Sequence, residues 1–87
     1  MFEEVINVNN IPTIDLHGES SDIARVLIES FIEENIKLKN YNIAIIHGKG
    51  LGILKKTTHE VLRKNKNVID FKIYYFNDGM TIVKLKK

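Results

Sequence analysis

The chain has 87 residues, which suits one domain with a modest core and leaves no room for a second domain. It contains no cysteine, which excludes disulfides and thiolate metal sites, and no apolar run approaches membrane-spanning length. The formal net charge is +2, but residues 1–36 carry eight acidic side chains against one arginine (−7), whereas residues 37–87 carry twelve basic against three acidic (+9).

The basic second half favours a polyanionic partner, although a solvated basic surface has the same composition. The first residues lack the basic-then-apolar layout of a signal peptide, so we expect a cytoplasmic location and no membrane association.

Hydrophobic periodicity predicts six elements in the order β-α-β-α-β-β. Strands are predicted over residues 13–18, 41–47, 68–76 and 80–86, and helices over residues 21–38 and 53–64. Ser20 or Ser21 is the expected cap of the first helix. We expect residues 1–11 to form an arm or a short extra strand, and residues 12–87 to form one domain.

This order predicts a two-layer α/β (α+β) fold, with a mixed four-stranded sheet and both helices on one face. Strands joined through a helix should run parallel, and the Asn77-Asp78-Gly79 hairpin signal should add an antiparallel strand. Ligands of open α/β sheets bind beyond the carboxyl ends of parallel strands. We therefore expect the strand ends at His17-Gly18, at His47-Gly48 and at Asn77–Gly79 to meet at one edge of the sheet, which we call the rim.

A strand-to-helix turn of glycines and one lysine follows the apolar run Ile43–Ile46. Its residues are His47, Gly48, Lys49, Gly50, Leu51 and Gly52. The N–H groups and the dipole at the start of the following helix would favour an anion such as phosphate. The pattern is not a dinucleotide or phosphate-loop fingerprint, and a tight βα turn with a surface lysine explains it equally well.

Aromatic residues end the strand before the hairpin signal. Ile69, Phe71, Ile73 and Tyr75 are predicted to share one face, so Tyr75 is assigned to the strand core, although two of the three rings at residues 74–76 could instead stack on a nucleobase. The remaining histidine, His59, lies within the second predicted helix and is interpreted as structural or exposed.

Two motifs at the rim resemble those of the Smr (small MutS-related) domain family. Ile14-Asp15-Leu16-His17-Gly18 is similar to the family's Leu-Asp-Leu-His-Gly motif, and residues 45–54 are similar to its His-Gly-x-Gly motif with the usual flanks. Their order and spacing agree with the predicted elements over about residues 12–87. The resemblance implies nucleic-acid binding, with DNA-nicking or RNA-cleaving endonuclease activity in several members, and action at ribosomes or in DNA repair in others.

The resemblance also implies roles for residues of the rim. Asp15, His17 and His47 are the candidate catalytic residues. The candidate nucleic-acid or phosphate contacts are Gly18, Gly48, Lys49, Gly50, Gly52, Lys55, Lys56, Asn77, Gly79 and Thr81. RNA cleavage can use the 2′-OH and two histidines without metal, whereas DNA cleavage needs water, for which Asp15 with Mg²⁺ or Mn²⁺ is a candidate activator. We expect the isolated domain to be a monomer that binds DNA or RNA, with the ribosome as a further candidate partner.

One segment departs from the family pattern. The family's glycine-rich third segment is reduced to one glycine in Asn77-Asp78-Gly79, although the Thr-x-Val-x-Leu tail is retained at residues 81–85. Because this segment belongs to the rim, the sequence leaves two functions open: an endonuclease, and a module that binds nucleic acid or ribosomes without cutting.

Overall fold

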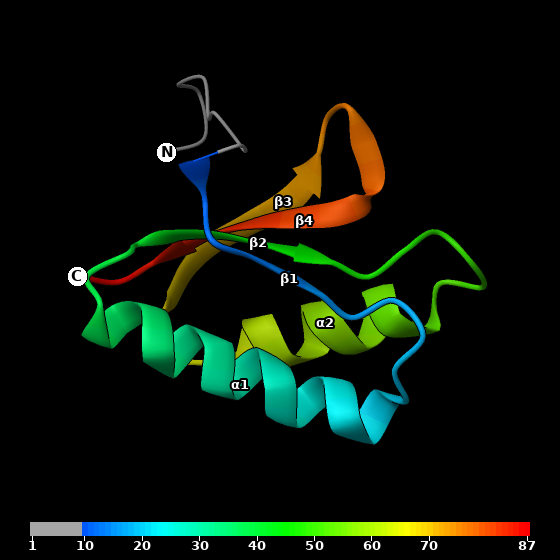
Figure 1. The fold of residues 1–87 in the computed structure, drawn as a ribbon, viewed down its shortest axis with the longest axis horizontal. Coiled ribbons are helices and arrows are strands. Elements are labelled where there is room, and N and C mark those ends of the chain that lie inside the picture. Colours follow the sequence, from blue (N-terminus) through cyan, green and yellow to red (C-terminus); the bar gives the residue numbers. More distant parts are fainter. Residues whose placement is uncertain (1–9) are drawn as a thin grey trace.

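The computed structural model describes residues 10–87, so the arm or extra strand predicted for residues 1–11 lies, as far as residue 9, outside the described residues. The elements are β1 (Thr13–Asp15), α1 (Ser21–Lys37), β2 (Asn42–Ile46), α2 (Ile53–Lys64), β3 (Val68–Tyr74) and β4 (Asn77–Leu85) (Figure 1). The predicted order of elements and the predicted mixed four-stranded sheet are both confirmed.

The sheet has the strand order β1-β2-β4-β3. β1 is parallel to β2, with Ile14 opposite Ile45, and β4 is antiparallel to both of its neighbours. β2 and β3 therefore run in the same direction, as predicted for strands joined through a helix, but β4 lies between them. This arrangement brings the carboxyl ends of β1, β2 and β3 and the start of β4 to the same edge of the sheet, which confirms the predicted rim.

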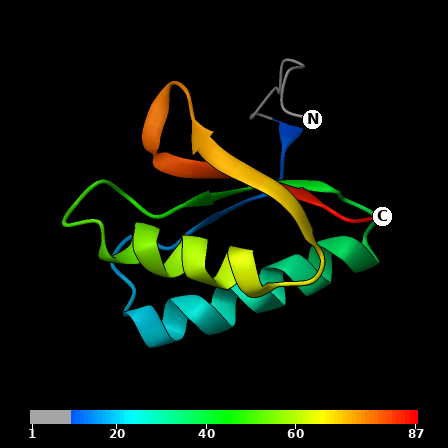
Figure 2. The ribbon, with the colours of Figure 1, turned by 180° about the vertical axis from the view of Figure 1, so that it is seen from behind.

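Both helices cover one face of the sheet, as predicted (Figures 1 and 2). The core between the layers is built from buried aliphatic side chains of both helices, β2 and β4, together with Leu16 after β1; among them are Ile28, Ile45, Leu62 and Val83. Outside this core, Arg25 of α1 is paired with Glu60 of α2 at 3.0 Å between Nη2 and Oε1. Within residues 10–87, neither helix has the length and apolar character needed to cross a membrane.

The helix boundaries follow local signals. The Ser20 Oγ accepts a hydrogen bond from the N–H of Ile23 at 3.3 Å, which makes Ser20 the cap of α1. α2 spans the predicted residues and begins after Gly52, whose φ of 81° lies in the left-handed region that favours glycine. α1 and α2 both start at the rim, because each follows a strand that ends there.

The hairpin turn does not lie where the sequence placed it. The turn consists of Tyr75 and Phe76, because Tyr74 pairs with Asn77, and the Asn77-Asp78-Gly79 segment belongs to β4. Ile73 pairs next with Thr81, so residues 78–80 form a bulge opposite β3. The backbone of this bulge is directed to β2 instead, since the Gly79 carbonyl accepts hydrogen bonds from the N–H groups of residues 47 and 48.

The predicted apolar face of β3 is also corrected in part. A register shift between Val68 and Asp70 turns Ile69 outward, where it is 58% exposed, while Val68 and Phe71 pack against the core. Tyr75 is 88% exposed because it belongs to the turn, so its assignment to the strand core is wrong.

Candidate functional site

The two His-Gly strand ends meet around one hollow at the rim. Its volume is about 340 Å³, and its lining comprises His17, Gly18, His47, Gly48, Lys49, Gly50, Leu51, Gly52, Ile53 and Leu54. The exposed His17 ring lies against residues 47–52, which we call the second loop. The His17 Cδ2 atom would be 3.6 Å from a Cβ placed on Gly48 of this loop. Seven of the predicted site residues are therefore gathered in one place, from the segment that follows β1 and from the loop between β2 and α2.

Asp15 is exposed on β1 and caps the turn that follows it. Its Oδ1 accepts the backbone N–H of His17 at 2.9 Å, an arrangement that holds the His17 backbone beside the hollow. The structure thus supports the interpretation of this carboxylate as a cap of the turn. Its second oxygen, Oδ2, still has acceptor sites for another partner.

His47 is oriented differently from His17. Its side chain is only 4% exposed, and both ring nitrogens have partners: Nδ1 lies 3.1 Å from the Gly48 carbonyl oxygen and Nε2 lies 2.8 Å from the Thr81 Oγ1. A carbonyl only accepts hydrogen bonds, so Nδ1 carries the proton, and Nε2 accepts from the Thr81 hydroxyl. In this geometry the ring presents no free nitrogen to a ligand in the hollow, which favours a positioning role for His47.

The Thr81 hydroxyl connects His47 to His59, a residue that the sequence did not assign to the site. The Nε2 of His59 also lies 2.8 Å from Oγ1, and because this hydroxyl donates to His47 it must accept from His59. Hydrogen bonds therefore run from α2 through β4 to the carbonyl of Gly48. We call the side chains of His59, Thr81 and His47 the His-Thr-His chain. Thr81 is fully buried, so its hydroxyl supports the loop from behind rather than facing a ligand.

The signal that could have identified His59 was weak. Its ring packs against Phe71 of β3, with centroids 4.9 Å apart, and lies edge-on to His47, with centroids 5.9 Å apart. Helical spacing alone places residue 59 beside the buried residues of α2, but only the pairing of β2 with β4 shows that a hydroxyl stands between the two imidazoles.

The surroundings lower the pKa of both histidines of the His-Thr-His chain. Burial is the largest cause for His47; the hydrogen bond to Gly48 and the charge of Asp78 act in the opposite direction, and that of Lys55 reinforces it. Burial is again the largest cause of the lowered pKa of His59, followed by the charges of His47, Lys55 and Arg63. Neutral imidazoles, which the chain of hydrogen bonds requires, are thereby favoured.

This pKa shift predicts how stability depends on pH. Because the folded-state pKa values lie below the unfolded value near 6.5, the unfolded chain binds more protons as the pH falls, and the stabilisation by the neutral imidazoles is lost below that value. We expect the urea midpoint to fall as pH is lowered from 8 to 5, measured by circular dichroism, and to fall less steeply in His59→Gln. An equal slope in both proteins would contradict the prediction.

Gly79 lies directly behind the second loop. A Cβ on this residue would be 3.2 Å from the carbonyl carbon and 3.3 Å from the Cα of Gly48, so the loop would have to shift by a few tenths of an ångström. Asn77, half-buried, accepts the N–H of Gly79 through Oδ1 at 2.9 Å. Both residues therefore shape the bulge that supports the loop, and the retained glycine of this segment is the one that makes the close approach.

Charge at the hollow is partly neutralised within the domain. The Nζ of Lys49 lies 3.4 Å from Oδ1 of Asp78, and both side chains are 71% exposed. Two further lysines, Lys55 and Lys56, lie in the first turn of α2, where Gly52 provides no side-chain cap and no acidic residue is present in that turn. The free N–H groups of this turn and the three lysines make the rim electropositive.

Asp15 is the candidate for holding a divalent metal at the rim. Within the part of the chain that the structure describes, no three side chains of the His, Cys, Asp or Glu types come together as a ligand cluster. Mg²⁺ is, however, commonly held by one carboxylate together with substrate phosphates, and Asp15 has an acceptor oxygen for such an arrangement. A metal held there would activate water for attack on phosphorus.

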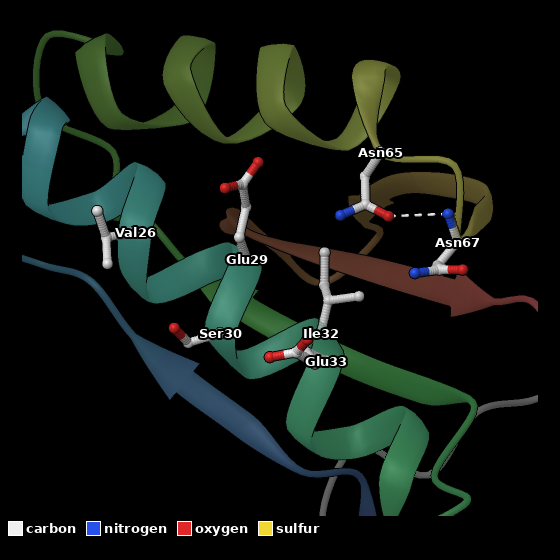
Figure 3. Close-up of a pocket in the computed structure, with 7 residues that line it drawn as sticks. All are labelled: Val26, Glu29, Ser30, Ile32, Glu33, Asn65 and Asn67. Carbon is white, nitrogen blue, oxygen red and sulfur yellow. Dashed lines mark hydrogen bonds between the residues drawn. The ribbon is translucent and has the colours of Figure 1, made fainter.

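A second hollow of about 380 Å³ lies between the middle of α1 and the segment that follows α2 (Figure 3). It is lined by Val26, Glu29, Ser30, Ile32 and Glu33 of α1 and by Asn65 and Asn67 after α2. On the α2 side of this hollow, Asn67 donates its backbone N–H to Oδ1 of Asn65 at 2.8 Å. Because two glutamates face this hollow, it would repel the polyanion that the rim attracts.

Comparison with known proteins identifies the family. A model of the Smr domain matches residues 14–86. The chain is 38% identical over 76 residues to a protein named endonuclease MutS2 from Geobacillus sp. (strain WCH70) and 33% identical over 78 residues to one of that name from Halothermothrix orenii, matches that cover 84% and 86% of this chain. The chain spans only about a tenth of the length of either relative, since the matches cover 10% of each.

Solved structures show the same fold. The Smr domain of Thermus thermophilus MutS2 matches with a TM-score of 0.86 and 29% identity, over 88% of this chain and 100% of that one. YdaL, a stand-alone small MutS-related protein from Escherichia coli, matches with a TM-score of 0.82 and 23% identity, over 86% of this chain and 64% of that one, a likeness that concerns the fold alone.

Proposed function

This chain belongs to the Smr domain family, and we propose that it is an endonuclease domain that binds nucleic acid at the rim and cleaves its phosphodiester backbone there. The observation that carries the proposal is the shared hollow, where His17 lies against Gly48 of the loop that leads to the N-terminus of α2. Such a site offers backbone N–H groups and lysines to a phosphate beside a group that transfers protons near neutral pH.

The residues divide into three roles in this proposal. His17 transfers a proton to or from the reacting oxygens, because its imidazole is exposed beside the hollow. Lys49 and the first turn of α2 bind the phosphate. His47 holds the loop through its hydrogen bond to Gly48, so it positions the phosphate site rather than touching the substrate.

A proposal that the domain binds without cutting is supported by one feature. Asp78 pairs with the lysine that would meet the phosphate, within the segment where the family pattern has more glycine. This pairing lowers the positive charge available to a transition state, although an exposed pair of this kind contributes little stability and opens readily.

Incubation of the purified domain with labelled single-stranded RNA and with supercoiled plasmid, each with and without EDTA, tests the proposal. Cleavage of RNA in EDTA that leaves 2′,3′-cyclic phosphate ends would establish attack by the 2′-OH, and metal-dependent nicking of plasmid would assign water activation near Asp15. Binding of both substrates without a cut would favour the non-catalytic module, and no binding would overturn both functions.

Salt concentration and the removal of single charges at the rim should change affinity in a defined way. If phosphate contacts dominate, log affinity should fall by roughly 0.7 to 0.9 per unit of log salt concentration for each contact. We expect Lys49→Ala to lower this slope by about one contact, and Asp78→Asn to tighten binding by about two- to fivefold, because it releases Lys49 from an exposed ion pair.

Fluorescence anisotropy of a labelled oligonucleotide at several salt concentrations measures both effects. Asp70→Asn is a matched control, because it removes the same charge from an exposed position at the far end of β3. Equal gains in Asp70→Asn and Asp78→Asn would show that only net charge matters, and a flat salt response would remove phosphate binding from the rim.

A further inference from the structure

Three aromatic rings form a cluster at the turn between β3 and β4. Phe76 lies edge-on to Tyr75, with centroids 4.9 Å apart and planes at 86°, and to Tyr74, with centroids 5.7 Å apart and planes at 68°. Tyr75 is 88% exposed and Phe76 is 79% exposed. We call Tyr74, Tyr75 and Phe76 the turn aromatics. Exposed rings contribute nothing to the hydrophobic core, and a cluster of them on the surface indicates a site of contact with a partner.

The turn aromatics lie at the same edge of the sheet as the hollow. The turn leads directly into Asn77, which accepts the N–H of Gly79, and the Gly79 carbonyl accepts hydrogen bonds from residues 47 and 48. Asp78, two residues after Phe76, is paired with Lys49 of the loop. Figure 1 shows the turn and the loop before α2 projecting at the same end of the molecule. Rings and phosphate-binding groups are thus joined by one short, hydrogen-bonded segment.

The edge-on packing gives the cluster a defined shape. Each aromatic contact restricts the rotation of its neighbours, so that little side-chain entropy remains to be lost when a flat ligand stacks on an exposed ring. The bulge at residues 78–80 and the hydrogen bond that the Gly79 N–H donates to Oδ1 of Asn77 hold the turn relative to the loop. A planar apolar ligand attached to a phosphate could therefore meet both features at once.

We propose that the turn aromatics are a stacking site for an unpaired nucleobase of the strand whose phosphate lies in the hollow, so that the domain selects single-stranded over duplex nucleic acid. The inference rests on the proposed function and extends it to the form of the substrate. Ring stacking discriminates in this way because the faces of paired bases are covered by their neighbours, whereas an unpaired base exposes its face. The basic second half of the chain, which contains the turn and the loop, favours a nucleic acid over a neutral apolar partner.

A comparison of the affinities for single-stranded and duplex nucleic acid tests the inference. Affinity is measured by anisotropy, at constant salt, for a short labelled strand and for the same sequence as a duplex, each in DNA and RNA. We expect the wild type to prefer the single strand, and Phe76→Ala to weaken single-strand binding by about five- to 150-fold, equivalent to about 1 to 3 kcal/mol per stacked base, with little change for the duplex. Phe76→Leu keeps the apolar bulk without the ring, and Tyr75→Phe keeps the ring without the hydroxyl. We expect loss in the first and retention in the second.

Abasic strands make the test specific to stacking. Removing the base at each position in turn should weaken binding at one position in the wild type, and this loss should disappear in Phe76→Ala, because the ring and the base are then already uncoupled. Wild-type binding that Phe76→Ala leaves unchanged would overturn the stacking site and leave the proposed function standing. Absence of wild-type binding to any nucleic acid would overturn the proposed function itself. Self-association in sedimentation that Phe76→Ala abolishes would assign the rings to a second copy of the chain and overturn the inference.

Discussion

His17→Ala should reduce the rate of backbone cleavage by about a hundred- to ten-thousandfold, while oligonucleotide affinity stays within a few fold of wild type. The imidazole is exposed at the end of β1 and lies against Gly48, beside the phosphate groups that Lys49 and α2 are proposed to bind. A residue that acts in proton transfer contributes to the transition state far more than to ground-state binding. Single-turnover cleavage of a labelled strand, with affinity measured on the same strand, separates the two effects.

Asp15→Asn is the matched comparison for His17→Ala. The amide oxygen of asparagine can still accept the N–H of His17, so this variant keeps the cap of the turn and removes only the charge. If Asp15 only shapes the turn, Asp15→Asn should cleave at the wild-type rate; if it orients a histidine or holds a metal, the rate should fall with affinity unchanged. Wild-type cleavage by His17→Ala would show that the rim is not where the chemistry takes place.

Thr81→Val should destabilise the domain by about 1 to 3 kcal/mol, because it leaves the buried Nε2 of His47 without its donor. Valine has nearly the shape of threonine, so the change removes two hydrogen bonds of the His-Thr-His chain without opening a cavity. The Gly48 carbonyl is held through His47, so the loop should also lose its fixed position. We expect weaker nucleic-acid binding and slower cleavage together, in contrast to the selective effect of His17→Ala.

Thr58→Val is the control for this substitution. Thr58 is buried like Thr81, but its Oγ1 has no hydrogen-bond partner among the described residues. The same chemical change should there be neutral or stabilising, since an unsatisfied hydroxyl is removed from the interior. Urea midpoints of the two variants give the comparison. Equal losses in both would mean that the His-Thr-His chain contributes nothing beyond packing.

Local signals in the sequence determined the elements and which strand ends meet around the candidate site. Apolar spacing predicted α2 over the residues that it occupies, and the cap of α1 was narrowed to Ser20 or Ser21. The two His-Gly pairs were placed at one edge because strands joined by helices run in the same direction. These properties depend on neighbours within one helical turn or one strand, so the sequence contains the required information.

Only the tertiary structure decided how the side chains of the site are used. The bulge in β4 moved the turn to Tyr75 and Phe76 and exposed their rings, because pairing with β2 takes up the backbone of residues that would otherwise close a hairpin. The same pairing places Thr81 between His47 and His59, 34 and 22 residues away along the chain. His17 and His47 both follow the end of a strand, yet one imidazole is exposed and the other is buried. The register that pairs Asp15 with Ile46 puts His47 opposite Leu16, on the face of the sheet that α2 covers, whereas His17 lies one residue further along. Register and burial of this kind arise from contacts between distant segments, which no local pattern of residues encodes.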